Sequence, residues 1–530
     1  MTPDARPRLD TGAHPLRVLF VRSGRHYWPI LNESDNFLLP LGYPALAAYL
    51  RQRMSNVQVE ILDACLEGIG WKSLGGVIAR KAPHVVCIGE KVVYGHEGFK
   101  AFNVARQACP DAVLVAGGHL FSALPEWTLE QCPAIDFVVR FEGEETLRDL
   151  LEALREGRDP STVLGIVYRQ DGQVRQTAPR PVIEDLDTLP IPAYDLVDLS
   201  RYSPFGRLWP KAVTVQRARG CVDTCNFCSW IVQEGRPSLA EDGTVQVKAG
   251  YRSKSVGRMV QEIELLYERY GVRYLFWTDA TWNVDNRWLR EFCTELIRRK
   301  YDLGWWAFTR IDNLLKQEED GTLALMVQAG LRHVLVGVER ADSDAYDWLN
   351  KHRYTREKTV AAFHLLRDRY PQVFRQATFI TGLRSDTAQD IRGLLDLAHE
   401  ADLDFAAFHP ITPFPGTPLF EQAKANGWLE ELDFDKYDMF YPVMATEHLS
   451  REEVAQLTAA NYRDFVGHKP LRYLKRMFSP YKNRRDLHRW FAFAVSRAMA
   501  VQAAESLRGH RHFEGFAGVN QLWKPAWYDD

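Results

Sequence analysis

The sequence has 530 residues, of which 46% are hydrophobic and 25% charged, and its formal net charge is −3. A chain of this length exceeds what one hydrophobic core usually supports, so we expect two or three domains. The slight negative charge gives no basic field that would attract nucleic acid, and we expect no such partner. No apolar run is long enough to cross a bilayer, so we expect no transmembrane segment.

The cysteines and the N-terminal residues favour a cytoplasmic protein. Five of the eight cysteines stand singly in the sequence, which is not the pattern of a disulfide framework. Residues 1–14 are polar and contain proline, without the apolar core of a secretion signal. A reducing cytoplasm is therefore the expected location.

Residues 15–156 alternate between short apolar runs and helical patterns, which predicts a Rossmann-like, doubly wound parallel sheet. The predicted strands are 16–21, 57–62, 85–89, 112–116 and 137–140, and the predicted helices are 40–53, 99–108 and 144–156. Ligands of such sheets bind beyond the C-terminal ends of the strands. The residues expected at that edge are Asp63, Glu90, Gly117, Gly118 and His119.

The sheet domain does not identify its ligand by itself. The Gly-x-Gly-x-x-Gly fingerprint of dinucleotide-binding domains is absent after the first strand, where the sequence reads Arg22-Ser23-Gly24-Arg25. A nucleotide, a flavin and a corrinoid all remain open at this point.

Three further segments follow this domain. Residues 157–210 contain a small hairpin and several prolines, which predicts an extended connector. Residues 211–418 again alternate, and the predicted strands are 212–215, 274–277, 305–309, 333–337, 376–382 and 405–409. Residues 419–530 are rich in helical pattern and aromatic side chains, so we expect a helical C-terminal domain.

Cys221, Cys225 and Cys228 form a Cys-x3-Cys-x2-Cys motif shortly after the apolar run Ala212–Val215. Thiolates are soft ligands that suit iron–sulfur clusters and zinc. A closed zinc site normally has four ligands, and no fourth Cys or His lies close by. Three cysteines can hold a [4Fe–4S] cubane through three irons and leave the fourth iron open to another ligand.

This spacing, with Phe227 before the last cysteine, resembles the signature of the radical S-adenosylmethionine (SAM) superfamily. The resemblance implies a partial (β/α)6 barrel in which SAM chelates the open iron. It also implies that an electron from the cluster cleaves SAM to methionine and a 5′-deoxyadenosyl radical. An external electron donor of the flavodoxin or ferredoxin type is the implied partner.

Further motifs at the predicted strand ends resemble the SAM contacts of that superfamily. Asp279 matches the segment that contacts the SAM amino group, and Thr309-Arg310 matches a strand end whose Arg can form a forked pair with the SAM carboxylate. Glu339 stands in a Gly-x-Glu strand, and Gly382 in the strand whose backbone holds adenine. For each single acid, a salt-bridged surface carboxylate is the alternative.

The order of the two domains resembles the cobalamin-dependent branch of the superfamily. Asp63, Gly117-Gly118-His119 and Glu142 carry this resemblance, which implies that they contact cobalamin. Glu90 departs from the small hydroxyl-rich loop often found there, and Phe141 stands where the family usually has Gly. A loop cap for His119 and a strand-end turn for Asp63 remain open as alternatives.

The segment Leu432–Asp438 resembles the anaerobic magnesium-protoporphyrin IX monomethyl ester cyclase group, whose relatives include many methyltransferases. We therefore expect an enzyme that functionalises an unactivated carbon of a small-molecule substrate, by methyl transfer from methylcobalamin. Oxidative cyclisation of that porphyrin ester or a related tetrapyrrole is the alternative. A non-catalytic protein that binds a corrinoid and an iron–sulfur cluster is the alternative of another class.

A basic stretch between residues 469 and 489 is interleaved with aromatic residues. An anionic substrate and a membrane surface are both open as its partner. We favour a solvated helix face with the aromatic side chains packed inward. Trp305 and Trp306 either wall a pocket or pack the barrel, and strand alternation should send one each way.

Overall fold

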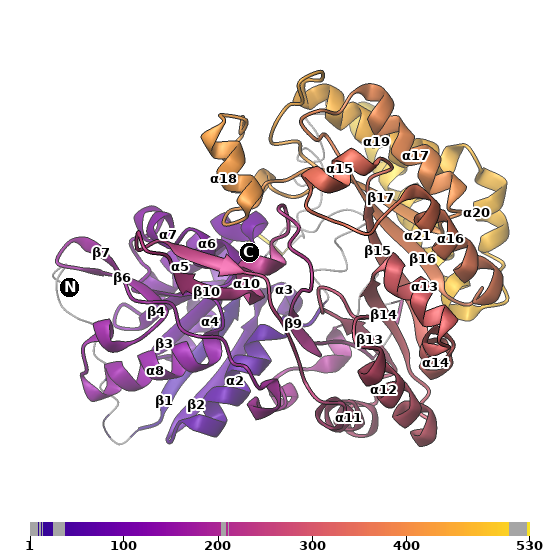
Figure 1. The fold of residues 1–530 in the computed structure, drawn as a ribbon. Helices are drawn as coiled ribbons and strands as arrows, with labels where there is room; N and C mark the ends of the chain where they lie inside the picture. Colours follow the sequence, from indigo (N-terminus) through magenta and orange to yellow (C-terminus); the bar gives the residue numbers. More distant parts are fainter. Residues whose placement is uncertain are drawn as a thin grey trace.

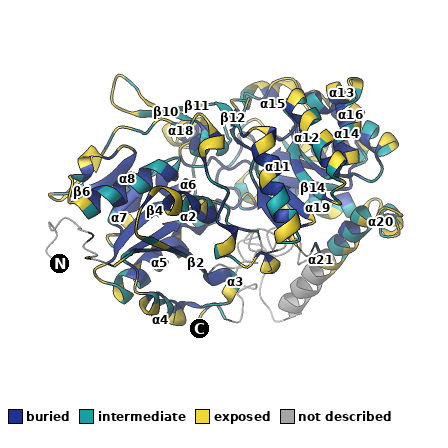
Figure 2. Ribbon diagram, turned by 90° about the horizontal axis from the view of Figure 1, so that it is seen from below, coloured by how far each residue is buried: buried dark blue, intermediate teal, exposed yellow. Residues whose placement is uncertain are grey.

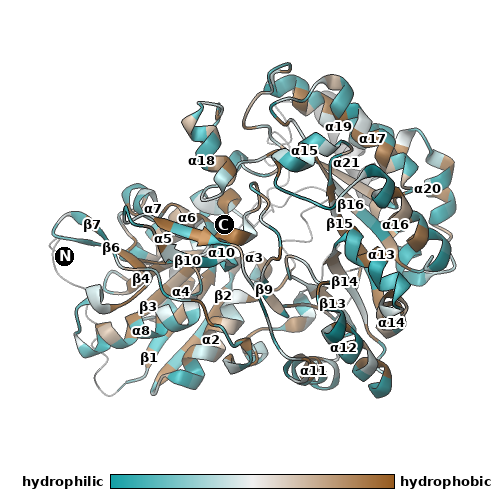
Figure 3. Cartoon of the chain, viewed as in Figure 1, coloured by the Kyte–Doolittle hydropathy of each residue, from teal (hydrophilic) through white to brown (hydrophobic). Residues whose placement is uncertain are grey.

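The computed structural model describes residues 9, 12, 14–24, 38–202, 208–209, 211–507 and 527–530. Two α/β units follow one another along the chain (Figure 1). The helices of residues 451–507 pack on the second unit, whereas Phe420 and Phe434 join the hydrophobic core of the first unit. The strands of both sheets are largely buried, except the exposed edge strand at residues 173–176, while the surrounding helices carry exposed outer faces (Figure 2). Those outer faces are largely hydrophilic (Figure 3). The predicted α/β fold class is confirmed.

The first sheet has seven strands in the order β2-β1-β3-β4-β5-β6-β7. Its parallel strands are β1 (Leu16–Arg22), β2 (Val57–Asp63), β3 (Val85–Gly89), β4 (Val113–Gly117) and β5 (Phe137–Val139). The predicted hairpin forms β6 (Ile166–Gln170) and β7 (Gln173–Gln176), and β6 pairs antiparallel with β5. The hairpin therefore extends the first sheet.

Helices cover both faces of this sheet. On one face, α2 (Gly42–Arg53) and α8 (Gly143–Glu156) share a hydrophobic core with the strands. On the other face lie α4 (Trp71–Lys81), which the sequence reading did not include, and α5 (Gly95–Ala108). Short helices follow the strand ends: α3 (Ala64–Glu67), η1 (Val92–Tyr94), α6 (His119–Ala123) and α7 (Pro125–Gln131).

The second sheet has six parallel strands in the order β17-β16-β15-β14-β13-β8. They are β8 (Ala212–Val215), β13 (Tyr274–Trp277), β14 (Gly304–Thr309), β15 (Leu331–Glu339), β16 (Phe374–Thr381) and β17 (Phe405–Pro410). The helices between them are α11 (Val256–Glu264), α12 (Asn286–Arg299), α13 (Ile311–Glu319), α14 (Thr322–Ala329), α15 (Ser343–Trp348), α16 (Arg356–Arg369) and α17 (Ala388–Glu400). Because all strands are parallel, their C-terminal ends meet at one edge, where barrel enzymes carry their sites.

Short strands that were not predicted surround the cysteine motif. β9 (Ala218–Gly220) pairs with β12 (Tyr251–Ser253), and after α10 (Trp230–Glu234), β10 (Arg236–Leu239) pairs with β11 (Val245–Lys248). Gly220 has φ +80°, and a Cβ there would lie 1.7 Å from the carbonyl oxygen of Gly250. The position before Cys221 therefore requires glycine.

The C-terminal part contains α18 (Pro418–Ala425), η7 (Phe434–Lys436), α19 (Arg451–Gly467), α20 (Pro470–Arg476) and α21 (Lys482–Leu507). Residues 527–530 return to the first unit, where the carbonyl oxygen of Tyr528 accepts a hydrogen bond from Trp71 N at 3.1 Å. Among the described helices, no segment has both the length and the apolar character needed to cross a membrane.

The aromatic residues of the basic stretch divide into two groups. Tyr473 and Trp490 pack against buried clusters of the barrel, as we predicted. Phe478 and Tyr481 are 71% and 38% exposed, so the prediction of inward packing is wrong for these two.

Candidate active site between the two sheets

A cavity of about 1090 Å³ lies between the two units and is lined by residues of both. The ends of β3 and β4 form one side, and the cysteine motif with several barrel strand ends forms the other. Trp306 lines the cavity while Trp305 is buried in the barrel core, which confirms the predicted alternation. The residues predicted to bind cofactors in the two units therefore line one cavity.

Cys221, Cys225 and Cys228 all line this cavity, in the loop between β9 and α10. The loop backbone is fixed, since Cys228 N donates to Cys225 O at 3.2 Å and Asn226 N donates to Leu349 O at 3.1 Å. Burial raises the pKa of Cys225 and of Cys228 to about 12, so both thiols carry protons when no metal is bound. A bound soft metal would replace these protons.

The separation of the three thiols fits a cluster better than a single ion. Tetrahedral zinc with Zn–S bonds of about 2.3 Å holds its sulfur ligands about 3.8 Å apart. Within the described residues, the only three candidate ligand atoms within 4.8 Å of one another belong to His96, Asp433 and Asp435. The three sulfurs are therefore not grouped as the ligands of a single ion are, and a cubane is the larger group that three cysteines bind.

Glu339 ends β15 at the cavity wall with φ +66°. Lys351 Nζ donates to Glu339 Oε1 at 2.8 Å and to Gly337 O at 2.6 Å. Thr378 Oγ1 donates to the other carboxylate oxygen at 3.3 Å. The sequence reading missed Lys351, because it lies twelve positions beyond Glu339 and outside any recognised motif.

Arg310 and Thr309 line the cavity at the end of β14. The Arg310 guanidinium forms ion pairs with Asp223 of the cysteine loop and, at 3.0 Å, with Asp312. The buried hydroxyl of Thr309 has no hydrogen-bond partner. A ligand that bonds to this hydroxyl would offset its desolvation cost.

Asp279 and Gly382 are described residues that lie behind the cavity wall rather than on it. Asp279 accepts from Ala218 N at 2.6 Å and Arg217 N at 3.2 Å, and burial raises its pKa to about 6. Gly382 N donates to Asp386 Oδ2 at 2.8 Å. Asp279 therefore holds the strand that leads into Cys221, and the backbone at Gly382 is itself held by Asp386.

Gly117, Gly118 and His119 line the cavity at the end of β4, facing Glu90 at the end of β3. A Cβ on Gly118, whose φ is +84°, would lie 2.8 Å from the Glu90 backbone, so glycine lets the two strand ends meet. His119 Nε2 is buried without a partner, and burial lowers the pKa of the ring to about 4. This neutral imidazole has a nitrogen left for a ligand, which fits the amide-rich edge of a corrinoid.

Asp63 and Glu142 both make contacts within the protein. Asp63 accepts from Leu66 N at 3.0 Å and Tyr202 Oη at 2.9 Å, and it does not line the cavity. These contacts match the alternative of a strand-end turn. Glu142 lines the cavity, but its carboxylate pairs with Arg219 and Arg252 of the second unit.

Asp438 is another wall residue that the sequence reading did not assign to the site. Its Oδ1 accepts from Phe440 N and Tyr441 N, both at 2.8 Å, while its buried Oδ2 has no partner. Burial raises the pKa of Asp438 to about 7. The only sequence signal is its place at the end of the Leu432–Asp438 segment.

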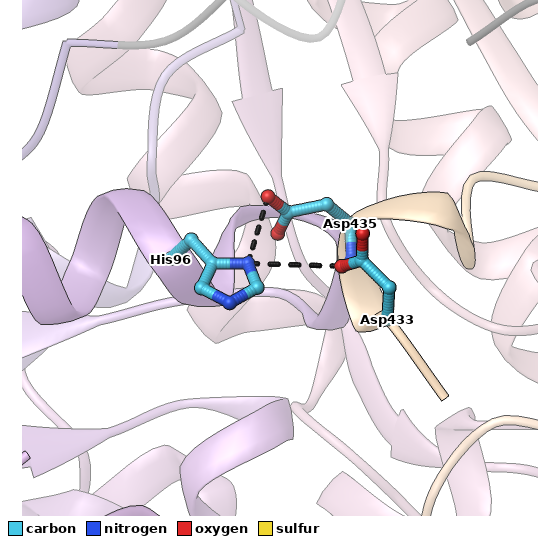
Figure 4. Close-up of side chains that lie close together, drawn as sticks. All are labelled: His96, Asp433 and Asp435. Atoms are coloured by element: carbon cyan, nitrogen blue, oxygen red, sulfur yellow. Dashed lines mark hydrogen bonds and ion pairs between the residues drawn. The ribbon is translucent and has the colours of Figure 1, made fainter. Parts of the chain in front are cut away.

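An ion pair outside the cavity joins the first unit to the C-terminal part (Figure 4). His96 Nδ1 of α5 lies 2.8 Å from Asp435 Oδ2 and 3.8 Å from Asp433 Oδ1. The bond to Asp435 raises the pKa of His96, although partial burial opposes this. Phe434, between the two aspartates, also packs on Trp127, so ionic and apolar contacts both join the C-terminal part to the first unit.

Both units match protein families. Residues 27–151 match the B12 binding domain, and residues 215–398 match the Radical SAM superfamily. The first match covers the sheet edge around His119, and the second covers the cysteine motif.

Two relatives align over most of the chain. An uncharacterized methyltransferase of Pyrococcus horikoshii is 28% identical over 80% of this chain and 87% of its own. An anaerobic magnesium-protoporphyrin IX monomethyl ester cyclase of Rubrivivax gelatinosus is 29% identical over 89% of this chain and 80% of its own.

Two solved structures share the fold. The radical SAM methyltransferase TsrM of Kitasatospora setae, with cobalamin and a [4Fe–4S] cluster bound, superposes with a TM-score of 0.65 at 18% identity, over 92% of this chain and 100% of that one. The cobalamin-dependent SAM radical enzyme OxsB superposes with a TM-score of 0.68 at 15% identity, over 92% and 71%. A B12-binding unit followed by a radical SAM unit defines the class, and this chain belongs to the cobalamin-dependent radical SAM enzymes.

Proposed function

We propose that this enzyme transfers a methyl group to an unactivated carbon of a small-molecule substrate, using SAM, a [4Fe–4S] cluster and cobalamin. The single cavity is the observation that carries the proposal, because the three cysteines and the edge around His119 both open into it. The methyltransferase of P. horikoshii, aligned over 80% of this chain, supports the same reaction type.

We assign the cluster to Cys221, Cys225 and Cys228, which line the cavity from one loop, whereas Cys87, the other cavity cysteine among the described residues, stands alone on β3. Thr309, Arg310 and Glu339 are the proposed SAM contacts. Asp279 and Gly382 are proposed to position backbone next to SAM. Lys351 holds Glu339 in place, so we add it to the set.

The proposed cobalamin contacts are Glu90, Gly117, Gly118 and His119, which line one side of the cavity. We also keep Glu142, which joins this side to the cysteine loop, whereas Asp63 is proposed to shape the neighbouring turn. When bound, the cluster supplies the electron that cleaves SAM and the corrinoid supplies the methyl group. The residues of the chain orient both groups toward one cavity and exclude water from it.

The proposal includes the domain boundaries, an electron donor and a location in the cell. We place the domain boundaries at 15–156, 157–210, 211–418 and 419–530. An external donor of the flavodoxin or ferredoxin type would reduce the cluster, and a cytoplasmic location would protect it.

Oxidative cyclisation of a tetrapyrrole is the second candidate function. The alignment with the R. gelatinosus cyclase, over 89% of this chain, favours it. The two candidates differ in the fate of the SAM methyl group, since only the methyltransferase passes it to cobalt and then to the substrate.

The test is anaerobic purification, reconstitution with iron, sulfide and hydroxocobalamin, and reduction in the presence of methyl-labelled SAM. We expect one corrinoid per chain, 5′-deoxyadenosine, S-adenosylhomocysteine and label on the cobalamin. Cys221→Ala should lose the cluster signal in EPR spectra, while Cys293→Ala, a buried cysteine outside the cavity, should keep it. Formation of 5′-deoxyadenosine without any label on cobalamin would favour the cyclase, and absence of SAM cleavage would refute both candidates.

A further inference from the structure

Helix α20 and the residues after it expose large apolar side chains. Leu471 is 77% exposed, Leu474 50% and Phe478 71%, and Tyr481 and Phe493 follow with 38% and 67%. These five residues, here called the α20 surface, are half of the ten exposed large hydrophobic side chains in the described part of the chain. Leu471 and Leu474 are three positions apart on α20 and so share one face, and Phe478 follows two residues after the helix. Grouped apolar side chains mark an interaction site more often than scattered ones do.

The opposite side of α20 is ionic and faces the barrel. Arg472 Nη1 lies 2.8 Å from Asp402 Oδ1, and the Arg476 guanidinium lies 2.9 Å from Asp402 and 3.2 Å from Asp404. Arg476 is only 9% exposed, and Asp404 is 1% exposed. Arg484 Nη2 adds a contact with Asp404 at 2.6 Å.

This polarity is the reverse of that of an ordinary surface helix, which turns its apolar stripe inward and its charges to water. Buried charges are costly unless partners are fixed around them, and the two aspartates are fixed by the barrel. The helix is therefore held by buried ion pairs in an orientation that leaves Leu471 and Leu474 outside.

The charge around the α20 surface is positive. Residues 469–493 contain eight Lys and Arg and one acid, Asp486. Three of the arginines face the barrel aspartates, and Asp486 lies 2.8 Å from Lys482. Lys469, Lys475, Lys482 and Arg489 are exposed beside the apolar side chains.

We propose that the α20 surface binds the headgroup region of an anionic lipid bilayer, with Leu471, Leu474 and Phe478 entering the interface. Exposed apolar side chains flanked by lysines are the combination that such an interface takes up, because apolar burial and phosphate attraction act together. Helix α20 lies at the outer edge of the molecule in two views at right angles, where a flat bilayer can reach it (Figures 1 and 2). A second copy of the chain would bring like charges together, which disfavours self-association.

The test is co-sedimentation of the full-length protein with two kinds of vesicle, pure phosphatidylcholine and the same lipid with about one third phosphatidylglycerol. We expect binding to the anionic vesicles only, weakened by salt. Leu471→Ser with Phe478→Ser, and separately Lys475→Glu with Lys482→Glu, should each weaken binding at least about tenfold. Leu239→Ser, which changes an exposed leucine of β10, should leave binding unchanged.

Both double variants alter exposed side chains, so each should unfold at the wild-type temperature and still cleave SAM in lipid-free buffer. SAM cleavage by these variants separates failure of this proposal from failure of the proposed reaction. Equal binding by wild type and variants, or no binding to anionic vesicles, would overturn the proposal. Loss of a self-associated state in the serine variant, or loss of flavodoxin binding by the variants without any lipid effect, would also overturn it and assign the surface to a protein partner.

Discussion

Arg219 Nη1 lies 2.9 Å from Glu142 Oε1, and this contact joins β9, the strand before Cys221, to the B12-binding unit. Arg219 also pairs with Glu144 at 2.5 Å, and Arg252 pairs with Glu142 at 2.8 Å. The four side chains are between 3% and 12% exposed. A buried ionic network therefore sets the position of the cysteine loop against the first unit.

We expect Arg219→Met to destabilise the protein by about 3–5 kcal/mol, because two buried carboxylates lose their main cation. Chemical denaturation of the iron-free protein measures this, and equilibrium binding of hydroxocobalamin should weaken in parallel. The matched control is Arg236→Met, since Arg236 pairs with Glu184 at an exposed position. Its effect on stability should be small, because water and salt screen an exposed ion pair. Equal effects of the two variants would contradict a special role for the buried network.

Lys351→Met should reduce SAM cleavage at least about tenfold while the iron content stays unchanged. The substitution removes the only cation that the structure places within hydrogen-bond distance of the described Glu339 carboxylate, which would then stand uncompensated at the cavity wall. 5′-Deoxyadenosine formation and iron analysis are the two readouts. Lys358→Met, at an exposed position of α16, is the control. Loss of iron together with activity would show that Lys351 supports the cluster loop rather than Glu339.

The strands of both sheets could be predicted because their apolar runs are long and well separated, as in β16 and β17. The cysteine loop could be found because three ligands lie within eight positions. The pairing of Arg219 with Glu142 could not be found, since it spans 77 positions and depends on how the two units dock. β9 and β12 are three residues long, too short for a periodic signal.

The direction in which a side chain points could not be predicted from the sequence. Asp279 is at the strand end where sequence reasoning put it, but its carboxylate turns toward the backbone of Arg217 and Ala218. Nothing in a single sequence tells a carboxylate that faces a cavity from one that holds a neighbouring strand. The orientation of α20 could not be predicted either. Its leucines face outward because its arginines pair with Asp402 and Asp404, which are distant in the sequence.

The ion pair of His96 with Asp435 should give a small pH dependence of stability. The pKa of His96 is raised by Asp435, so the pair stabilises the folded state below the usual His pKa of 6.5, and this contribution is lost as pH rises through the raised value. Both partners are more than one third exposed, so the effect is below about 1 kcal/mol. The melting-temperature difference between wild type and His96→Gln should shrink from pH 6 to pH 9. A fall in stability on adding a chelator to iron-free protein would instead indicate a cation bound by His96, Asp433 and Asp435.

The stability should depend on pH more strongly through Asp438 than through His96. Burial, rather than a charged partner, raises the pKa of Asp438 from the usual 3.8 to about 7. A raised carboxyl pKa stabilises the folded state at low pH, and this contribution is lost as pH rises up to the folded-state value. Between these two pKa values the stability relative to Asp438→Asn should fall by about 1.4 kcal/mol per pH unit, and it should level off above about pH 7. Asparagine keeps an oxygen for Phe440 N and Tyr441 N, so the variant isolates the titrating proton.

Denaturant titrations of both proteins across this range measure the slope, and Glu447→Gln, at an exposed position of the same C-terminal part, serves as the control. Parallel stability curves for wild type and Asp438→Asn would mean that Asp438 is ionised throughout, and water or a counter-charge would then have to reach its Oδ2. The predicted curve would mean instead that the cavity holds a carboxyl group that changes charge near neutral pH. Such a group donates a hydrogen bond to a cavity ligand when protonated and only accepts one when ionised. The pH dependence of ligand binding to wild type and variant would then reveal which of these forms the ligand selects.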